Sequence, residues 1–448
     1  MNTQTYDVVV IGTGTAGGTA AYQLQESGKR VAIVDAVPFG GTCALRGCQP
    51  KKYLVVNTHL AAHTRALVGR GFSAAATTDW AQLQAFKREF TDPVPESSVR
   101  SYRERGIDPW SGRARLVDAT TVVLEPGGES EGERLSAGTV LIATGARSRE
   151  LDIPGAQYVG TSDDFLELSS LPEAMVFIGG GYISLEFAFV AALAGVKVTI
   201  LQRGERVLQQ FPASLVDRVV EAGSAHNVSV VTGVDVERVE KTNGGLSVVT
   251  RDHGAFAGGF VMAAIGRVPN TDGMGLEPIG VALDRGAIVV DEYMQTSVDG
   301  VYAIGDCVAT KQLAPISDME AKAAATNIVS PRSVKVSYDS IPSVVFTHPQ
   351  MASVGVTADE ADPDTMKVKT GSGAGWPNNR RLQADPVYYE TVVDGQSGRI
   401  LGAHLVGPYA GEQINLFALA IASGTSVEQF RCLPWAYPTH GSDVKYMV

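Results

Sequence analysis

Residues 6–18 read Tyr-Asp-Val-Val-Val-Ile-Gly-Thr-Gly-Thr-Ala-Gly-Gly, an apolar run that ends in a glycine-rich turn. The apolar run predicts a buried parallel strand. A helical pattern over 19–27 follows the turn, and a second apolar strand over 30–34 ends at Asp35. The order of strand, glycine turn, helix, strand and acid predicts a Rossmann-like α/β unit.

The glycine spacing predicts a function as well as a fold. Gly12 permits the tight turn, Gly14 lets the backbone approach a pyrophosphate, and Gly17 lets the helix pack on the strand. The helix N-terminus would then face the phosphates, and Asp35 would accept hydrogen bonds from a ribose. The unit therefore predicts a dinucleotide site, and the alternative is a tight turn without a ligand.

A second unit of the same kind lies in the middle of the chain. The strand 175–178 leads into a turn that contains Gly179 and Gly181, and Ser184 stands where a third glycine is common. A helix is expected from this turn to Ala194. The chain is therefore predicted to bind two dinucleotides.

The end of the next strand, 196–201, indicates which nicotinamide nucleotide binds. An acid there would hold a ribose 2′-hydroxyl, but the chain has Gln202, followed by Arg203 and Arg206. Arginine forms charge-assisted bonds with a 2′-phosphate, which a carboxylate would repel. The pattern predicts NADPH in preference to NADH, and the alternative is that both arginines are solvated turn residues.

A pair of cysteines follows the first unit, in the stretch 40–52, Gly-Gly-Thr-Cys-Ala-Leu-Arg-Gly-Cys-Gln-Pro-Lys-Lys. Residues five apart on a helix point in different directions, so Cys43 and Cys48 need a distorted turn to come within bonding range, with Cα atoms about 7 Å apart or less. The two lysines after Pro50 favour thiolate over thiol. The stretch predicts a redox-active disulfide, and the alternative is two buried cysteines that never bond.

Length and composition restrict the class of protein. A chain of 448 residues predicts two to four domains, and a net charge of −11 without a long basic run argues against general nucleic-acid affinity. Four cysteines suit a reducing compartment. No signal pattern begins the chain, and no apolar run reaches about 18 residues. We expect a cytoplasmic protein without a membrane span.

The remaining segments complete the domain plan. The run 139–147 predicts a strand that ends in a turn at Gly145, and 296–307 predicts a strand that ends at Asp306, which would bind a ribityl hydroxyl or cap the next helix. Alternating segments from about residue 338 predict an antiparallel sheet, followed by two helices near 411–423 and 426–431. The predicted domains are a discontinuous first domain, a second domain and a C-terminal α+β domain suited to dimerisation, over 1–149 with 266–337, 150–265, and 338–448.

His59 and His63 are spaced four residues apart and share a face of a predicted helix over 53–68. Two imidazoles without a third ligand nearby in the sequence do not make a metal site. They are interpreted as helix-surface histidines, and no metal site is predicted. Cys307 has no partner in the sequence and is expected to be a small buried residue.

Two dinucleotide units with a cysteine pair after the first resemble the flavin-dependent pyridine nucleotide–disulfide oxidoreductases, over essentially the whole chain. The most specific element is Gly-Gly-Thr-Cys-x4-Cys-x-Pro-x-Lys at 40–52. The resemblance implies one non-covalent FAD per subunit, NADPH, and a homodimer whose active site is shared between subunits. It implies an FAD-binding domain, an NAD(P)-binding domain and a dimerisation domain.

The resemblance also implies a role for each site residue. Cys48 would be the charge-transfer thiolate against the flavin, and Cys43 would attack the substrate. Lys52, near flavin N5, would pair with Glu186, and Tyr182 would cover the flavin until nicotinamide displaces it. The implied FAD residues are Gly12, Gly14, Gly17, Asp35 and Asp306, the implied NADPH residues are Gly179, Gly181, Arg203 and Arg206, and further cofactor-binding residues are Gly41, Thr42, Gly145 and Gly266.

The C-terminal segment departs from the family pattern. Where the family has His-Pro-Thr-x-x-Glu, this chain has Tyr437 in place of the histidine and Ser442 in place of the glutamate. A tyrosine, with a reference pKa of about 10, is a poor base at pH 7 but can donate a hydrogen bond to a leaving thiolate. His440 is a second candidate for the missing imidazole.

The resulting hypothesis is an enzyme that passes electrons from NADPH through FAD to a Cys43–Cys48 disulfide and on to a small disulfide substrate. One alternative is the reduction of a metal ion or quinone, which needs no acid to protonate a leaving thiolate. Another alternative is a redox sensor that does not turn over.

Overall fold

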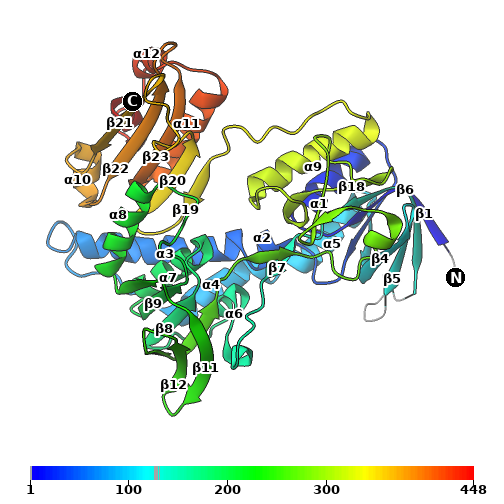
Figure 1. Ribbon diagram of the computed structural model, residues 1–448, viewed down its shortest axis with the longest axis horizontal. Helices are drawn as coiled ribbons and strands as arrows, with labels where there is room; N and C mark the ends of the chain where they lie inside the picture. Colours follow the sequence, from blue (N-terminus) through cyan, green and yellow to red (C-terminus); the bar gives the residue numbers. More distant parts are fainter. Residues whose placement is uncertain (1–2, 126–129, 131) are drawn as a thin grey trace. The chain divides into compact units, whose positions relative to one another are not determined.

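The computed structural model describes residues 3–125, 130 and 132–448, and the chain divides into two compact units (Figure 1). Each unit is assembled from three separate stretches of sequence. Unit 1 comprises Met1–Lys51, Ala85–Arg149 and Arg267–Tyr338, and unit 2 comprises Lys52–Gln84, Glu150–Gly266 and Asp339–Val448. The three-domain division expected from the sequence stays a prediction.

The sheet of unit 1 is built on β1, which pairs in parallel with β2 on one side and β6 on the other. The strand order is β3-β2-β1-β6-β5-β4, and β18 pairs with β6 in parallel. The strands are β1 (Thr3–Ile11), β2 (Val31–Asp35), β3 (Asp108–Ser111), β4 (Arg113–Asp118), β5 (Thr121–Glu125), β6 (Arg134–Ile142) and β18 (Val301–Ala303). The Rossmann-like unit expected at the start of the chain is confirmed.

Helices α1 (Thr15–Glu26) and α9 (Ala314–Val329) of unit 1 lie side by side (Figure 1). The hydroxyl of Thr19 donates to Asp318 over 3.0 Å and joins the two helices. Because helices and loops cover the sheet, residues 8–11 and 31–34 are all buried, as expected for parallel strands. The other elements are α2 (Gly41–Leu45), α5 (Val94–Glu104), β7 (Ala146–Ser148), β15 (Arg267–Pro269), η2 (Glu277–Ile279), β16 (Leu283–Asp284), β17 (Ala287–Ile288) and η3 (Gly305–Cys307).

Unit 2 contains a four-stranded parallel sheet in the order β10-β9-β8-β14. Helix α7 (Tyr182–Leu193) is buried at every residue from 184 to 193, so it is an interior helix. The other elements of this part are η1 (Ala156–Tyr158), α6 (Ser162–Leu166), β8 (Ala174–Ile178), β9 (Lys197–Gln202), α8 (Ala213–Ser224), β10 (Val228–Thr232), β11 (Val236–Thr242), β12 (Gly245–Thr250), β13 (Ala255–Gly258) and β14 (Phe260–Ala263).

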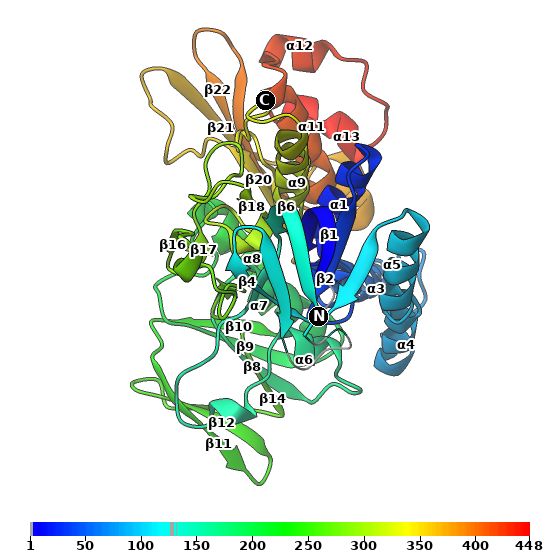
Figure 2. The same cartoon turned by 90° about the vertical axis from the view of Figure 1, so that its right-hand side faces the viewer.

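A five-stranded antiparallel sheet, ordered β19-β20-β23-β22-β21, forms the C-terminal part of unit 2 (Figure 2). Helix α11 (Ala410–Ala422) packs on β20 and β23. The expected antiparallel sheet and two following helices are confirmed, and β20 was missed. The elements are β19 (Ser343–Val345), β20 (Gln350–Gly355), β21 (Met366–Ser372), α10 (Pro377–Leu382), β22 (Tyr388–Asp394), β23 (Ile400–Gly407), α12 (Val427–Cys432), α13 (His440–Asp443) and η4 (Val444–Tyr446).

Helices α3 (Cys48–Ala66) and α4 (Trp80–Thr91) have residues in both units. One core cluster of unit 2 takes Leu54 from α3, Phe177 from the parallel sheet and Val345 from the antiparallel sheet. A shared apolar core therefore fastens α3 to both sheets of unit 2. Among the described residues, none of the helices has the length and apolar character needed to cross a membrane.

Replacing Phe165 by alanine is expected to destabilise unit 2 by roughly 3–5 kcal/mol, because large-to-small core changes leave a cavity. The ring is fully buried and lies 4.7 Å from Phe187 and 6.0 Å from Trp80 between ring centroids. Urea unfolding followed by tryptophan fluorescence measures the change. Phe72→Ala is the control, since Phe72 is 46% exposed and its loss should shift the transition by about 0.5 kcal/mol or less. Equal shifts for the two variants would contradict the assignment of Phe165 to the core.

Candidate active site

The first glycine turn is too tight for any side chain. Gly12 has φ +112°, and a Cβ atom there would lie 2.2 Å from the carbonyl oxygen of Ala143. A Cβ atom at Gly17 would lie 1.9 Å from the carbonyl oxygen of Gly12, which shows how closely α1 approaches the strand end. Gly14 caps α1 without a side-chain hydrogen bond, so the first amides of the helix are open to an anionic ligand.

Asp35 ties this turn to the end of β2. Its Oδ2 accepts from the backbone N–H of Thr13 at 2.8 Å and from the Thr13 hydroxyl at 2.5 Å, and its Oδ1 accepts from the N–H of Val37 at 3.1 Å. The carboxylate therefore fixes the shape of the turn. Binding a ribose, the role expected from the sequence, would be additional to this structural role.

The cysteine stretch is seated on the same turn. Gly41 has φ +67°, and a Cβ atom there would lie 2.3 Å from the Cα atom of Gly14. Only glycine at position 41 allows this approach, because a Cβ atom at Gly14 would make an ordinary contact of 3.9 Å with the Cα atom of Gly41. Cys43 lies in α2 and Cys48 begins α3, and the helix break at Gly47 between them is the distorted turn that the spacing required. Thr42 is exposed beside this approach.

The two thiols interact with each other. They are free cysteines, so the pair is a dithiol here. A hydrogen bond from Cys48 lowers the pKa of Cys43 to about 6, with help from Thr15 and the Lys51 charge, while burial acts in the opposite direction. The same hydrogen bond and burial raise the pKa of Cys48. In this dithiol, Cys43 is therefore the sulfur that ionises more easily. The resemblance instead places the charge-transfer thiolate on Cys48. The roles of Cys48 against the flavin and of Cys43 against the substrate stay predictions.

A third set of candidate residues in unit 1 comprises Asp306, Gly145 and Thr144. Burial raises the pKa of Asp306, and the charge of Arg267 opposes the rise. Gly145 directly precedes β7 and has φ +67°. Its carbonyl oxygen accepts a hydrogen bond from the N–H of Asn270 at 2.9 Å. The hydroxyl of Thr144 is buried without a hydrogen-bond partner among the described residues. An open helix N-terminus, a glycine cradle and an unpaired buried hydroxyl all fit a bound dinucleotide.

Sequence reasoning missed Glu320, which holds the loop before Asp306. Its Oε2 accepts from the N–H of Gly305 at 2.7 Å. Its Oε1 accepts from the hydroxyls of Thr310 at 2.8 Å and Tyr338 at 2.9 Å. The sequence offers only one of two acids, Asp318 and Glu320, in an alanine-rich helix, and nothing local distinguishes a buried acid from a solvated one.

The second glycine turn, in unit 2, repeats the geometry of the first. Gly179 has φ +103°, and a Cβ atom there would lie 2.4 Å from the carbonyl oxygen of Ala264. Gly181 caps α7 without a side-chain bond. Oε1 of Gln202 accepts from the N–H of Gly180 at 2.8 Å, as Asp35 accepts from Thr13. A neutral amide therefore does here what a carboxylate does in the first unit.

The two arginines after β9 differ in how they are held. Arg203 is exposed, while Arg206 is half-buried and donates to the carbonyl oxygen of Gln209 at 3.1 Å. Both are cationic groups on the segment that follows Gln202, so they fit a bound 2′-phosphate. Gly266, with φ +109°, is the last residue of the stretch Glu150–Gly266 of unit 2.

Lys52 and Glu186 meet at a residue that the sequence did not single out, Phe346. The Nζ atom of Lys52 lies 3.8 Å from the ring centroid of Phe346, whose N–H donates to Oε1 of Glu186 over 2.9 Å. Glu186 is only 1% exposed. Tyr182 is the first residue of α7, one turn before Glu186. The expected neighbourhood of Lys52 and Glu186 is thus organised by the start of the antiparallel sheet.

The two C-terminal candidates for the acid–base role, Tyr437 and His440, differ in their exposure to solvent. Tyr437 is 73% exposed. The ring of His440 lies 4.4 Å from that of Tyr409 between centroids, Gln413 donates to its carbonyl oxygen at 2.6 Å, and burial lowers its pKa while Asp443 opposes this. A cavity of about 430 Å³ beside it is lined by Tyr409, Glu412, Gln413, Leu416, Thr439, His440 and Gly441.

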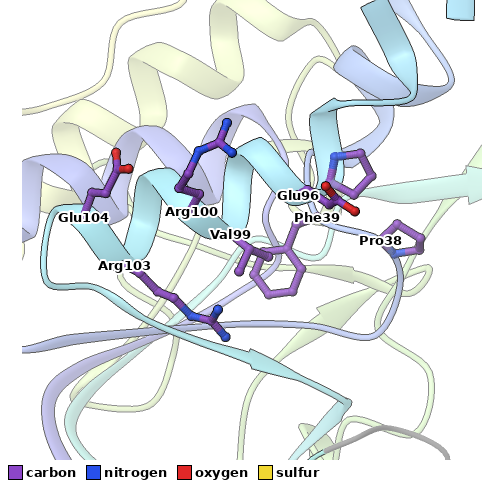
Figure 3. A pocket seen from close by; sticks show the side chains of 8 residues that line it. Pro38, Phe39, Glu96, Val99, Arg100, Arg103 and Glu104 are labelled. Atoms are coloured by element: carbon purple, nitrogen blue, oxygen red, sulfur yellow. The ribbon is translucent and has the colours of Figure 1, made fainter.

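Unit 1 also has a cavity of about 460 Å³ between α5 and the segment after β2 (Figure 3). Phe39 and Val99 form its apolar part, and it is further lined by Pro38, Pro95, Glu96, Arg100, Arg103 and Glu104. None of the site residues expected from the sequence lines it. It carries no assigned chemistry.

The interpretation of His59 as a surface residue is wrong, because its side chain is only 9% exposed. The reason is that residues distant in sequence cover this face of α3, and a further imidazole, that of His348, lies 5.0 Å from His59 and 5.1 Å from His63 between centroids. The part of the chain that the structure describes contains no group of three or more ligands arranged to hold a metal ion. Cys307 is fully buried, as expected.

Comparison with known proteins decides the family. Residues 6–333 match the pyridine nucleotide-disulphide oxidoreductase family, and residues 341–448 match its dimerisation domain. The chain belongs to this family. It is a pyridine nucleotide-dependent flavoprotein disulfide reductase, its cofactors are FAD and NAD(P)H, and it carries the dimerisation domain of the homodimeric members.

Relatives of several activities resemble the whole chain. It is 35% identical to glutathione reductase of Burkholderia cepacia over 438 residues, covering 97% of this chain and 96% of that protein. It is 31% identical to dihydrolipoyl dehydrogenase of Geobacillus stearothermophilus (97% and 94% covered) and 30% identical to mercuric reductase of Staphylococcus aureus (94% and 78% covered). The Cu(II) complex of the HOCl-induced flavoprotein disulfide reductase RclA from Escherichia coli matches with a TM-score of 0.91, at 26% identity, over 100% of this chain and 99% of that one.

The reduced cysteine pair is expected to react with iodoacetamide at a rate that rises with an apparent pKa of about 6. In a Cys432→Ser background, which removes an exposed thiol, Cys48→Ala should move this pKa upward because the donated hydrogen bond is lost. Alkylation rates between pH 5 and pH 9, followed by mass spectrometry, measure the shift. An unchanged apparent pKa in Cys48→Ala would contradict the hydrogen-bonded pair.

Proposed function

We propose that the enzyme transfers electrons from NADPH, through FAD, to a disulfide between Cys43 and Cys48, and from the resulting dithiol to a small disulfide substrate. The observation that carries the proposal is the seating of the cysteine pair on the first glycine turn, where Gly41 meets Gly14. FAD, when bound, supplies the relay between hydride chemistry and thiol chemistry. A cysteine pair held against a dinucleotide turn is placed to exchange electrons with such a group.

The chain's own residues perform the second half of the reaction. The thiolate of Cys43 attacks one sulfur of the substrate disulfide, forms a mixed disulfide and releases the other half as a thiolate, which takes up a proton. Cys48 then attacks the sulfur of Cys43, which restores the Cys43–Cys48 disulfide and releases the second thiol. Each cycle converts one disulfide, one NADPH and one proton into two thiols and NADP⁺.

The preference for NADPH rests on the second glycine turn. Gln202 keeps the turn in shape without a negative charge, and Arg203 and Arg206 follow it on the same segment. A carboxylate at Gln202 would repel the 2′-phosphate, whereas arginines bind it. The similarity to glutathione reductases supports this preference.

For the outward half-reaction we propose a homodimer in which each subunit lends its C-terminal segment to the other. The dimerisation domain and the exposure of Tyr437 support this arrangement. Tyr437 would donate a hydrogen bond to the leaving thiolate. His440 is the weaker candidate, since its ring is half-buried and packs at a tilt against the ring of Tyr409. Sparse cysteines support a reducing compartment, the cytoplasm.

A second candidate is the reduction of a metal ion. The similarity to a mercuric reductase and to a Cu(II) complex of RclA favours it, and so does Tyr437 in place of an acid–base histidine. A metal ion takes electrons from the dithiol without a leaving thiolate to protonate. Steady-state NADPH oxidation with a panel of small disulfides, Cu(II) and Hg(II) separates the two functions. No specific observation favours a quinone, and the enzyme relatives disfavour a sensor without turnover.

Anaerobic titration of the FAD-loaded enzyme with NADPH is expected to produce a long-wavelength charge-transfer band. In Cys48→Ala this band should be lost, and in Cys43→Ser the flavin should still be reduced while disulfide turnover falls by at least about a hundredfold, because the attacking thiolate is absent. Cys432→Ser serves as the matched control, with an exposed thiol outside the pair. A band that persists unchanged in Cys48→Ala would refute the assignment of Cys48.

The double change Arg203→Gln, Arg206→Gln is expected to raise the KM for NADPH about tenfold or more and to leave that for NADH nearly unchanged, because bonds to charged groups contribute roughly 1.5–3 kcal/mol. Initial rates with both nucleotides give the comparison. Arg251→Gln is the control, an exposed arginine of unit 2 that pairs with Asp235 at 2.6 Å. If the two KM values rise equally, these arginines do not recognise the 2′-phosphate.

A further inference from the structure

Four histidines that are far apart in the sequence meet in unit 2. His59 and His63 lie on α3, His226 on the turn between α8 and β10, and His348 between β19 and β20. The ring centroid of His348 lies 5.0 Å from that of His59, 5.1 Å from that of His63 and 5.4 Å from that of His226, with the rings tilted by 60–75°. His348 is therefore the centre of an imidazole cluster.

The charged groups that act on this cluster are all cationic. Arg65 of α3 acts on His226 and His348, and Lys52 of α3 acts on His59. No carboxylate is among the groups that act on these four rings in the described part of unit 2. The Nε2 atom of His59 is buried without a hydrogen-bond partner among the described residues. The cluster is thus built to hold neutral imidazoles.

Burial lowers the pKa values of all four rings, and a neighbouring cation adds to this for His59, His226 and His348. Burial is the main cause in each case, and it lowers the pKa of His59 to about 3 and that of His348 to about 2. The pKa values of His63 and His226, which are half-buried, are lowered as well. A folded-state pKa below the ordinary value of about 6.5 means that the closed cluster is most stable above pH 6.5 and loses stability as the pH falls below it.

The cluster is coupled to the residues around Lys52 through a short segment. His348 is two residues from Phe346, which contacts Lys52 through its ring and Glu186 through its N–H. Thr347 between them is fully buried and donates to the carbonyl oxygen of Pro349 at 2.7 Å. Residues 346–348 therefore lie against α3 and α7 at one end and against the imidazole cluster at the other.

We propose that His59, His63, His226 and His348 form a proton-sensitive latch that holds the segment 346–348 on α3 at neutral pH and releases it in acid. Release would loosen the contacts of Phe346 with Lys52 and Glu186. Acid would therefore weaken the packing around Lys52, the residue expected near the flavin. The latch lies wholly within unit 2. It stands independently of the substrate proposed above, because its tests measure structure rather than turnover.

The size of the effect follows from proton uptake. We take one imidazole that is neutral while the latch is closed and has a pKa of about 6.5 once the latch is open. Because this imidazole takes up a proton only in the open state, the equilibrium constant for opening rises about tenfold between pH 7.5 and pH 5.5. Two such rings give about a hundredfold. A divalent metal ion would be an alternative occupant, but Arg65 and Lys52 disfavour a cation, and the described rings are not arranged as a metal site.

Hydrogen–deuterium exchange of the FAD-loaded protein tests the latch. Amide protection factors of residues 344–350 and 56–64, corrected for the intrinsic effect of pH, are expected to fall at least about tenfold between pH 7.5 and pH 5.5. In His348→Phe, which keeps an aromatic ring but removes one titrating group, the fall should be about tenfold smaller than in the unmodified protein. A fall smaller than about twofold in the unmodified protein, or an equal fall in His348→Phe, would overturn the proposal.

Further variants keep the test decisive if His348→Phe does not fold. His63→Gln and His226→Gln change half-buried rings at the edge of the cluster and should each reduce the fall in protection. His253→Gln, an exposed histidine between β12 and β13, should behave as the unmodified protein. If ZnCl2 at pH 7.5 protects 344–350 in the unmodified protein but not in His226→Gln, the cluster is a metal site and the latch is refuted.

Discussion

The structure of unit 1 depends on one close approach of two backbone segments, that of Gly41 to Gly14. A Cβ atom at Gly41 would lie 2.3 Å from the Cα atom of Gly14, so the contact exists only because residue 41 lacks a side chain. This contact places the short helix with Cys43 beside the start of α1. The redox pair and the dinucleotide turn are therefore one structural feature, although Gly41 follows Gly14 by 27 positions in the sequence.

Features that depend on local pattern were predictable from the sequence. Apolar runs such as 8–11 became buried parallel strands, and each glycine turn was recognised from the spacing of its glycines. Gln202 was singled out for the charge that it lacks, and the structure adds that its amide oxygen binds Gly180. These successes share a cause, since the apolar run of a strand and the glycine spacing of a turn are both patterns within a short stretch of sequence.

Features that depend on long-range packing were not predictable. Glu320 belongs to no motif in the sequence, yet it organises the loop at Gly305. Phe346 carried no motif, and the strand β20 that follows it was missed. His59 was interpreted as a surface residue because His226 and His348, more than 160 residues away, have no relation to it in the sequence. Only the assembly of unit 2 from three stretches brings these residues together.

The bond from the N–H of Gly180 to Gln202 has a consequence for how such enzymes diversify. Glutamate has the same shape as glutamine and offers the same acceptor oxygen at that position, so the turn would keep its geometry if one residue exchanged an amide for a carboxylate. The charge presented to an incoming nucleotide would change while the backbone stayed in place. Selection can therefore act on the choice of nucleotide at this position with little cost to folding, which makes the second turn an evolvable part of an otherwise constrained scaffold.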